Sequence, residues 1–430
     1  MQRADWSGIR EQSAKVNSEN SYEYEQSELP EFRKFSRREI YKALGVASAD
    51  GVKKLIDKVS EHILDTTGEF VEFGEKDDFS GKYTYRLDEI YRILDTIPEM
   101  SSLRATKNKI SKAFRAPRDQ GAYVMTIANQ KGGVGKTTFT IQTALGQALM
   151  RFERPRILVI DFDPQGSLHA YFDGREISIK TTPTVAKYLQ QDRYSDVVNF
   201  NSTKEEKRDF ILNNIVRKSS VPNVDYCPAF SEDMELLTLL DRLEQSFEDG
   251  KYHGTEAYSV FREEVIEPIK HDYDLIIIDT APQSTIYTKV SLFAADHLVV
   301  PAPTRRMDFD STKDFIDQTA EWVTEVLYPE MDYEGKGLKY FDVVKTMHNH
   351  SQNAHSDMNV LYNSAYPHNT YTIPLSALAI YNTLSQEHEC IYTHSSNSAE
   401  GWKTAKAEWD RLNDHFRRTI SQEWSEANEF

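Results

Sequence analysis

The chain has 430 residues, a formal net charge of −17 and 39% hydrophobic residues. This length predicts more than one folding unit with a sizeable core, and the composition excludes a disordered or fibrous protein. No apolar run reaches the ~18 residues that a membrane-spanning helix needs. The polar first thirty residues also lack the apolar segment of an export signal, so we expect a cytoplasmic protein that does not act on membranes.

Cysteines and the distribution of charge narrow the class further. Cys227 and Cys390 lie far apart and neither belongs to a CxxC pair, so the sequence predicts no disulfide framework and no zinc or iron–sulfur site. Charges balance over residues 1–118, so the acidity belongs to the C-terminal part. Two basic segments, 33–58 and 104–118, are the first places to expect nucleic-acid contacts.

Four segments follow one another along the chain. Residues 1–30, rich in Glu, Ser and Asn, predict a weakly packed or partner-dependent arm, with dimerisation as a candidate role. Residues 31–98 predict a small winged helix-turn-helix domain that binds DNA. Residues 99–120 form a basic connector, and residues 121–430 form an α/β domain with C-terminal helices.

The helix-turn-helix prediction rests on two short amphipathic segments. The first helix begins after Ser36, and Glu39 stands three residues on, as in a capping box. A second helix, capped by Ser48 or Asp50, runs to about Val59. The apolar residues expected on the inner faces of the two helices are Ile40, Ala43, Leu44, Val52, Leu55, Ile56 and Val59.

The wing is expected after these helices. Segments Glu69–Phe73 and Tyr83–Leu87 are rich in residues that favour strands, and a polar stretch with two glycines separates them. Residues 88–97 predict one further helix, which Pro98 closes.

From Tyr123 onward the sequence has short apolar runs of strand length, each followed by polar residues and a helical period. Such runs are typical of parallel strands covered by helices on both faces. The fold class predicted for this part is a doubly wound, mostly parallel α/β sheet. Its expected strands are Val124–Ala128, Ile157–Ile160, Leu275–Ile278 and Leu298–Val300.

A glycine-rich segment, 129–138, lies between the first of these strands and a helix over Phe139–Leu149. Glycines let the backbone wrap around phosphates, and the helix N-terminus supplies N–H donors and positive potential. Lys136 is expected to reach the β- and γ-phosphates, and the Thr137 hydroxyl to bind Mg²⁺. The sequence therefore predicts a P-loop that binds ATP and Mg²⁺.

A carboxylate follows another apolar strand. Segment 272–279 is a Walker B pattern, in which the strand delivers Asp279 beside the P-loop to hold Mg²⁺, usually through water. With the P-loop, this motif predicts a nucleotide-hydrolysing enzyme.

The P-loop departs from the ordinary pattern, because Gln130 stands where a glycine is usual and Lys131 precedes the glycines. It resembles the deviant Walker A motif (KGGxGKT) of the ParA/MinD group. Segment 161–166 resembles the Walker A′ motif of that group. The resemblance implies that Lys131 reaches phosphates bound to the other subunit of an ATP-sandwich dimer. It also implies that Asp163 orients the attacking water and Asp161 belongs to the Mg²⁺–water shell or a switch region.

The expected site is then as follows. Catalytic roles fall to Lys131, Lys136 and Asp163, and Mg²⁺ contacts to Thr137 and, through water, Asp279. Nucleotide-binding residues are Lys131, Gly132, Gly133, Val134, Gly135, Lys136, Thr137, Thr138, Asp161 and Asp279.

The whole arrangement resembles type Ia ParA plasmid-partition ATPases, over roughly residues 121–400 and a preceding winged-helix-like region. Segment 298–303 resembles the proline-containing loop of that family, and 341–347 is a loose match to its adenine contacts. The resemblance implies ATP-driven homodimerisation, nonspecific DNA binding by the dimer, and hydrolysis stimulated by a ParB-like centromere-binding partner. It further implies operator binding by the N-terminal domain, autorepression, and a nucleoid-associated location.

The basic residues of the N-terminal region lie on a polar helix face that is suited to contacts with DNA phosphates. The alternative is that this face is exposed to solvent and the region is a dimerisation module. Expected DNA contacts are Arg37, Arg38, Lys53, Lys54 and Lys58. The connector cluster of Arg104, Lys107, Lys109, Lys112, Arg115 and Arg118 touches DNA or forms a soluble linker helix. A surface for nonspecific DNA would come from Lys403, Lys406, Arg411, Arg417 and Arg418, among which acidic residues are interleaved.

Three other classes share features with this sequence. A MinD-like membrane-cycling ATPase needs an amphipathic C-terminal helix, and Trp409, Leu412, Phe416, Ile420 and Trp424 have near-helical spacing, but acidic residues between them favour a helix packed on the sheet. An iron–sulfur reductase relative lacks suitable cysteines. A nucleotide-sensing transcriptional repressor predicts ATP binding without turnover.

Overall fold

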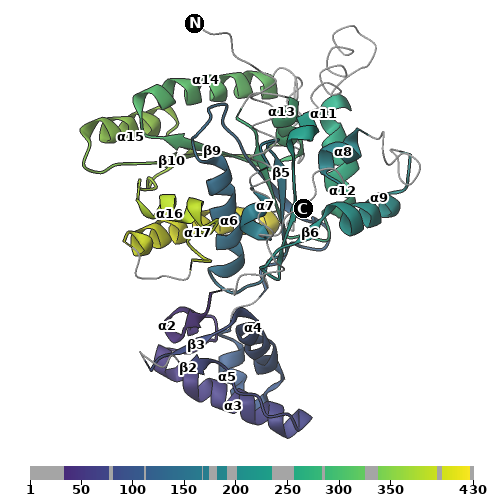
Figure 1. The fold of residues 1–430 in the computed structure, drawn as a ribbon, viewed down its shortest axis with the longest axis vertical. Helices are drawn as coiled ribbons and strands as arrows, with labels where there is room; N and C mark the ends of the chain where they lie inside the picture. The colour runs from purple at the N-terminus through teal and green to yellow at the C-terminus, as the bar shows by residue number, and fades with distance from the viewer. Residues whose placement is uncertain are drawn as a thin grey trace, which may run out of the picture.

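A computed structural model of the protein describes residues 33–76, 81–110, 113–166, 168–173, 182–190, 201–234, 256–282, 286–324, 338–394 and 400–426. The predicted arm over residues 1–30 therefore lies outside the described residues. A small N-terminal unit sits below a large α/β unit in Figure 1.

The N-terminal unit combines a three-stranded antiparallel sheet, ordered β1-β3-β2, with helices packed against it. All the apolar residues expected on the inner helix faces are buried. Its elements are β1 (Phe35–Ser36), α2 (Arg37–Ile40), α3 (Ala49–Thr67), β2 (Glu75–Lys76), β3 (Tyr83–Tyr85), α4 (Leu87–Thr96) and, in the connector, α5 (Arg104–Lys107).

The predicted start of the first helix is confirmed, whereas the predicted end of the second helix, at about Val59, is wrong. The Glu39 carboxylate accepts hydrogen bonds from the backbone N–H and the hydroxyl of Ser36, both at 2.9 Å, as a capping box requires. Helix α3 continues past the expected end at Val59 and stops at Gly68, whose φ of 74° is left-handed.

The strand predicted at Glu69–Phe73 is wrong. Phe70 is 71% exposed while Phe73 is buried, and the Gly74 N–H donates to the Glu89 carboxylate at 2.9 Å, so the chain turns before it joins the sheet. Pairing with β3 begins only at Glu75. The winged helix as a class stays a prediction.

The α/β unit is built on an eight-stranded sheet ordered β11-β10-β9-β4-β8-β5-β7-β6, parallel except for β6 against β7. The four predicted strands occupy its centre. The strands are β4 (Tyr123–Ile127), β5 (Ile157–Phe162), β6 (Arg217–Lys218), β7 (Val224–Cys227), β8 (Leu275–Thr280), β9 (His297–Pro303), β10 (Tyr340–Thr346) and β11 (Thr370–Tyr371).

Helices cover both faces of this sheet (Figure 1). Leu275 and Ile277 of β8 pack with α6 and α17, whereas Ile276 and Ile278 pack with α8, α11 and α13, as in a doubly wound fold. The helices are α6 (Lys136–Leu149), α7 (His169–Phe172), α8 (Val185–Leu189), α9 (Lys204–Phe210), α11 (Glu256–Phe261), α12 (Glu267–Ile269), α13 (Ile286–Ala294), α14 (Arg306–Trp322), α15 (Asn353–Ala365), α16 (Ile380–Gln386) and α17 (Trp402–Glu426), with short turns η1 (Ile97–Glu99), η2 (Ser101–Leu103), η3 (Ile211–Ile215), η4 (Ser231–Met234) and η5 (Arg262–Ile266).

The apolar stripe of the C-terminal helix lies in the core. The Phe139 ring of α6 packs edge-on against Trp409 at 5.1 Å and Phe416 at 6.3 Å, and the whole stripe from Trp409 to Trp424 is buried. The predicted packing of the last helix on the sheet is confirmed. No helix within the described ranges is both long enough and apolar enough to cross a membrane.

Asp274, just before β8, joins the connector to the α/β unit. Its carboxylate is fully buried and accepts hydrogen bonds from Arg115 Nη1 (2.8 Å), Ala116 N (3.0 Å) and Arg156 N (2.7 Å). Burial alone would raise the pKa of Asp274, but the hydrogen bonds from Arg156 and the two backbone N–H groups outweigh it and hold the pKa below its usual value.

Asp274→Asn is therefore expected to destabilise the fold by about 2–4 kcal/mol near neutral pH, because it removes a buried charge from two arginines. A carboxyl group whose pKa is depressed by folding stabilises the protein above its unfolded pKa, and that stability is lost as the pH falls through the folded pKa. Thermal unfolding of wild type and variant between about pH 7 and about pH 3 should show their midpoints converging as the pH falls. A constant difference over that range would contradict this account.

Candidate nucleotide-binding site

The glycine-rich loop takes a conformation that glycine alone adopts without strain. Gly133 and Gly135 have φ values of 72° and 87°, and Gly135 caps the N-terminus of α6. A Cβ atom added to Gly133 would meet nothing within 4 Å, so the backbone angle, and not crowding, requires glycine there. The loop therefore presents its N–H groups around the start of a 14-residue helix.

Lys136 is folded back into this loop. Its side chain is buried, and Nζ donates to the Lys131 carbonyl at 3.3 Å. Burial lowers the pKa of Lys136, and the negative charges of Asp279 and Asp163 act in the opposite direction. These three groups therefore lie within electrostatic reach of one another.

Two buried carboxylates lie one residue before the ends of neighbouring strands, beside the loop. Asp161 of β5 and Asp279 of β8 are register partners in the sheet. Thr140 Oγ1 donates to Asp279 Oδ1 at 3.0 Å, and the Thr137 hydroxyl donates to the same carboxylate. Burial raises the pKa of Asp279 to about 6, and burial followed by the Asp279 charge raises the pKa of Asp161 well above its usual value.

Asp163 lies at the turn that follows β5. Its N–H donates to Asp161 Oδ1 at 2.9 Å, and its own Oδ1 accepts from Gln165 N at 2.9 Å. The half-buried carboxylate is thus held at the rim of the site next to Asp161.

These residues fit Mg²⁺ with a nucleotide phosphate chain. Among the described residues, Oδ2 of Asp161 and Oδ2 of Asp279 are buried without a hydrogen-bond partner, an arrangement that a cation or its bound water satisfies. Loop N–H groups, the helix N-terminus and Lys136 offer the complementary donors for phosphate oxygens.

The Lys131 side chain points away from Lys136 and toward the start of α14. Its Nζ forms an ion pair with Asp308 in the first turn of α14 and donates to the Met307 carbonyl at 3.4 Å. Nothing in the sequence pattern indicated Asp308. Its side chain is 3% exposed, and Arg305 Nε binds its other oxygen at 2.6 Å.

A cavity of about 420 Å³ opens beside the loop. Of the predicted adenine segment 341–347, only Thr346, the last residue of strand β10, and Met347 line this cavity. Segment 375–379, which the sequence did not indicate, forms another wall. The remaining lining residues are Val134, Gly135, Thr138, Phe139, Tyr381, Asn382 and Trp409.

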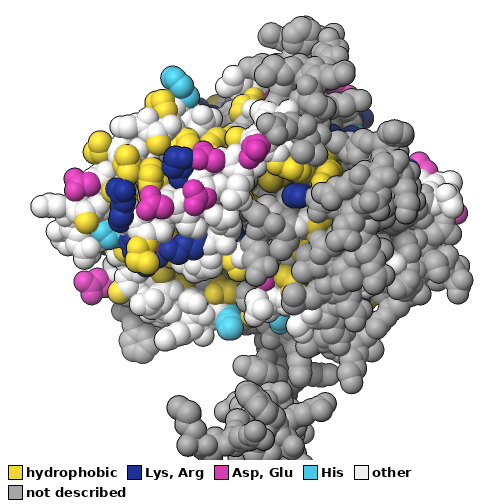
Figure 2. Space-filling model, turned by 90° about the horizontal axis from the view of Figure 1, so that it is seen from above, with side chains coloured by type: hydrophobic (Ala, Val, Ile, Leu, Met, Phe, Trp, Pro, Cys, Tyr) yellow, Lys and Arg dark blue, Asp and Glu magenta, His cyan; other side chains and the backbone are white. Residues whose placement is uncertain are grey.

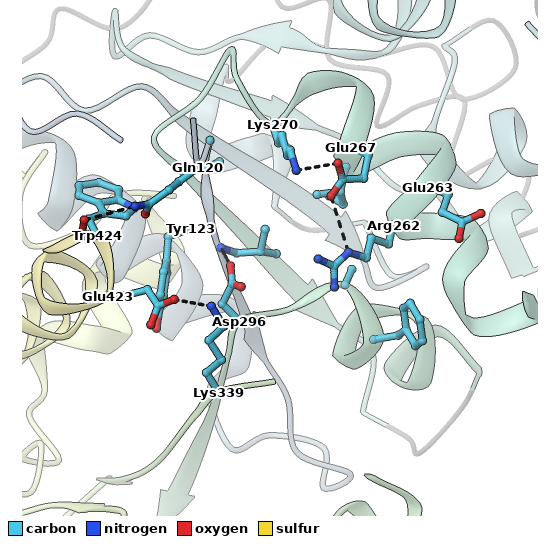
Figure 3. Close-up of a pocket in the computed structure, with 16 residues that line it drawn as sticks. Gln120, Tyr123, Arg262, Glu263, Glu267, Lys270, Asp296, Lys339, Glu423 and Trp424 are labelled. Atoms are coloured by element: carbon cyan, nitrogen blue, oxygen red, sulfur yellow. Dashed lines mark hydrogen bonds and ion pairs between the residues drawn. The ribbon is translucent and has the colours of Figure 1, made fainter. Parts of the chain in front are cut away.

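A larger cavity, about 690 Å³, lies at the opposite edge of the sheet, where β4 begins (Figure 3). Its charged side chains pair mainly with one another: Lys339 with Glu423, and Lys270 with Glu267 at 2.7 Å. Asp296 accepts from Val124 N at 2.9 Å. Among the described residues, no glycine-rich loop lines this cavity. We therefore assign phosphate binding to the carboxyl edge of the sheet.

The residues predicted to contact DNA divide into two kinds. Lys53, Lys54 and Lys58 are exposed on α3, with Asp57 between Lys54 and Lys58, and Arg38 is exposed on α2. Arg37 is held within the N-terminal unit, where Nε donates to the Tyr85 hydroxyl at 3.1 Å and the guanidinium lies 4.7 Å over the Tyr83 ring.

Two of the other predicted basic residues are structural. Arg417 is buried, ion-paired with Glu153 and hydrogen-bonded to the Gln147 carbonyl at 2.7 Å, so it is not available to DNA. Arg115 of the connector is bound to Asp274. Lys112 lies outside the described residues.

A glycine-rich loop that opens a helix, facing two buried carboxylates at the carboxyl edge of a parallel sheet, is the arrangement of a P-loop nucleoside-triphosphate site. Residues 122–329 match the family model described as an AAA domain. The chain is 32% identical to Plasmid partition protein A of Escherichia coli over 205 residues, 47% of each chain. It is 27% identical to protein SopA of Escherichia coli K12 over 237 residues, 55% of this chain and 54% of that one. This region of the chain is therefore similar in sequence to partition proteins of the ParA type.

Structural comparison extends the likeness in fold beyond that region. A solved structure described as a partition protein matches 96% of this chain and 98% of its own, with a TM-score of 0.59 at 20% identity. The aligned region with the two Escherichia coli relatives is about half of each chain.

Lys136→Ala is expected to lower ATP affinity by at least about tenfold, because it removes the buried cation that faces the phosphates. Equilibrium binding of a fluorescent ATP analogue in the presence of Mg²⁺ measures this. Lys313→Ala, which changes an exposed lysine paired with Asp317 on α14, serves as the control. Unchanged affinity in the Lys136 variant would refute the site.

Proposed function

We propose that the chain is a DNA-partition ATPase in which Mg-ATP binding drives homodimerisation and DNA binding. One observation carries the proposal: in a region similar in sequence to partition proteins, Lys136 and the two unsatisfied carboxylate oxygens of Asp161 and Asp279 lie around one P-loop. Stimulation of hydrolysis by a ParB-like, centromere-bound partner and a cytoplasmic, nucleoid-associated location belong to the same proposal.

Each residue of the site has a separate role. Lys136 and the loop N–H groups bind and orient the phosphates, and Thr137 and, through water, Asp279 would hold Mg²⁺. Bound Mg²⁺ neutralises charge that develops on the phosphate oxygens. Asp163 orients a water molecule for attack, a task that needs position more than a strong base. Asp161, buried and adjacent, fixes the Asp163 backbone through their 2.9 Å hydrogen bond.

Dimerisation depends on Lys131, which reaches the phosphates of the second chain. Its side chain is 30% exposed at the rim of the site, next to Met307, which is 81% exposed. Seen from above, the side on which Figure 1 places α14, positive and negative side chains lie among hydrophobic ones on the described part of the surface (Figure 2). Such a mixture suits contact between two copies better than contact with DNA.

Two other surfaces serve DNA. Lys53, Lys54 and Lys58 on α3 contact operator phosphates, which supports autorepression through the N-terminal unit. Nonspecific DNA binding uses the exposed Lys403, Arg411 and Arg418, which share one side of α17 by helical spacing.

Steady-state ATP turnover with and without nonspecific duplex DNA tests the proposal. Wild type should turn over slowly, DNA should accelerate it, and added salt should suppress the acceleration because the DNA contacts are electrostatic. Asp163→Ala should keep ATP binding and lose turnover by at least about 100-fold, since the water is no longer positioned. ATP binding without turnover in wild type would point instead to a nucleotide-sensing repressor.

The operator contacts generate a separate expectation. Replacing Lys53, Lys54 and Lys58 by Ala should reduce the slope of log affinity against log salt by about 0.9 for each phosphate that the protein no longer neutralises. Electrophoretic or fluorescence titration of operator DNA at several salt concentrations measures the slope. Lys313→Ala should leave it unchanged, and an unchanged slope in the triple variant would remove α3 from the DNA interface.

A further inference from the structure

Lys131 has two partners that exclude each other. Its ammonium group pairs with Asp308 within one chain, whereas the proposed function has it reach the phosphates of a second chain. Its backbone meanwhile stays in the loop, where the carbonyl accepts from Lys136 and the N–H donates to Asn129 Oδ1 at 3.1 Å. Only the long side chain has to move between the two positions.

Asp308 is a fixed partner. It stands in the first turn of α14, where the helix N-terminus favours a carboxylate, and its N–H donates to the Arg305 carbonyl at 3.0 Å. Oδ1 faces Lys131 and Oδ2 faces Arg305 Nε at 2.6 Å. A carboxylate this buried needs a cation, and Arg305 remains as one when Lys131 leaves.

We propose that Asp308 is a positioning residue, and that its ion pair with Lys131 competes with the dimer contact and sets how much ATP the chain needs to dimerise. This inference rests on the proposed role of Lys131. Because Asp308 stays paired with Arg305, breaking the Lys131–Asp308 ion pair leaves no uncompensated buried charge. Lys131 can therefore exchange the Asp308 carboxylate for a phosphate of the second chain.

The sign of the effect separates this role from a structural one. Asp308→Asn weakens the hold on Lys131, so the ATP concentration for half-maximal dimerisation should fall by about tenfold. A variant that merely damaged α14 would need more ATP, not less. Asp308→Glu, which keeps the charge, should return the requirement toward the wild-type value.

The experiment is sedimentation velocity of the full chain across an ATP titration with Mg²⁺. Asp310→Asn is the matched control, since Asp310 lies two residues further on, is 64% exposed and meets only Arg306, at 3.8 Å, in the described structure. The control should behave as wild type. Thermal unfolding of every variant reports its folding separately.

Combining the variants separates failure of this inference from failure of the proposed function. If Lys131→Ala dimerises as wild type does, the proposed role of Lys131 is wrong, and this inference falls with it. If Lys131→Ala loses dimerisation but Asp308→Asn leaves the ATP requirement unchanged or raises it, the inference alone is overturned. An equal fall in the Asp310→Asn control, or a gain from Asp308→Asn in the Lys131→Ala background, would also overturn it.

Discussion

Two carboxylates buried side by side are the constraint on which the site depends. Asp161 and Asp279 lie near the ends of adjacent strands, each with an oxygen that no described residue satisfies, and burial raises the pKa of both. A buried charge of this kind is costly unless a cation compensates it, so the edge of the sheet is built for Lys136 and a divalent ion. The phosphate loop, its glycines and the start of α6 are arranged around that requirement.

Helix α6 links this edge to the rest of the molecule. It begins at the phosphate loop, and residues just after its end meet the N-terminal unit, where Phe152 packs edge-on against Phe35 at 5.0 Å and Arg154 binds Asp95. Its sides are held by α17 through Phe139, Trp409 and Phe416. A rigid element therefore runs from the nucleotide site to the unit proposed to bind the operator.

Much of this could be predicted from sequence, because the signals were local. Apolar runs gave the central strands, and the P-loop and Asp279 could be placed at one edge since parallel strands end together. Asp308 and segment 375–379 could not be predicted from sequence, because only the packing of helices distant in the sequence brings them to the nucleotide site. Arg417 appeared as one more basic residue, and only its burial against Glu153 shows that it is structural. The predicted domain boundaries and the roles of individual site residues stay predictions.

Hydrogen exchange of the backbone amides, compared with and without Mg-ATP, tests the central claim most directly. The account predicts new protection in segments 131–138 and 161–166, with little change around Tyr123, Lys339 and Trp424, which line the cavity at the opposite edge of the sheet. Protection confined to that opposite cavity, with none at the glycine-rich loop, would contradict it.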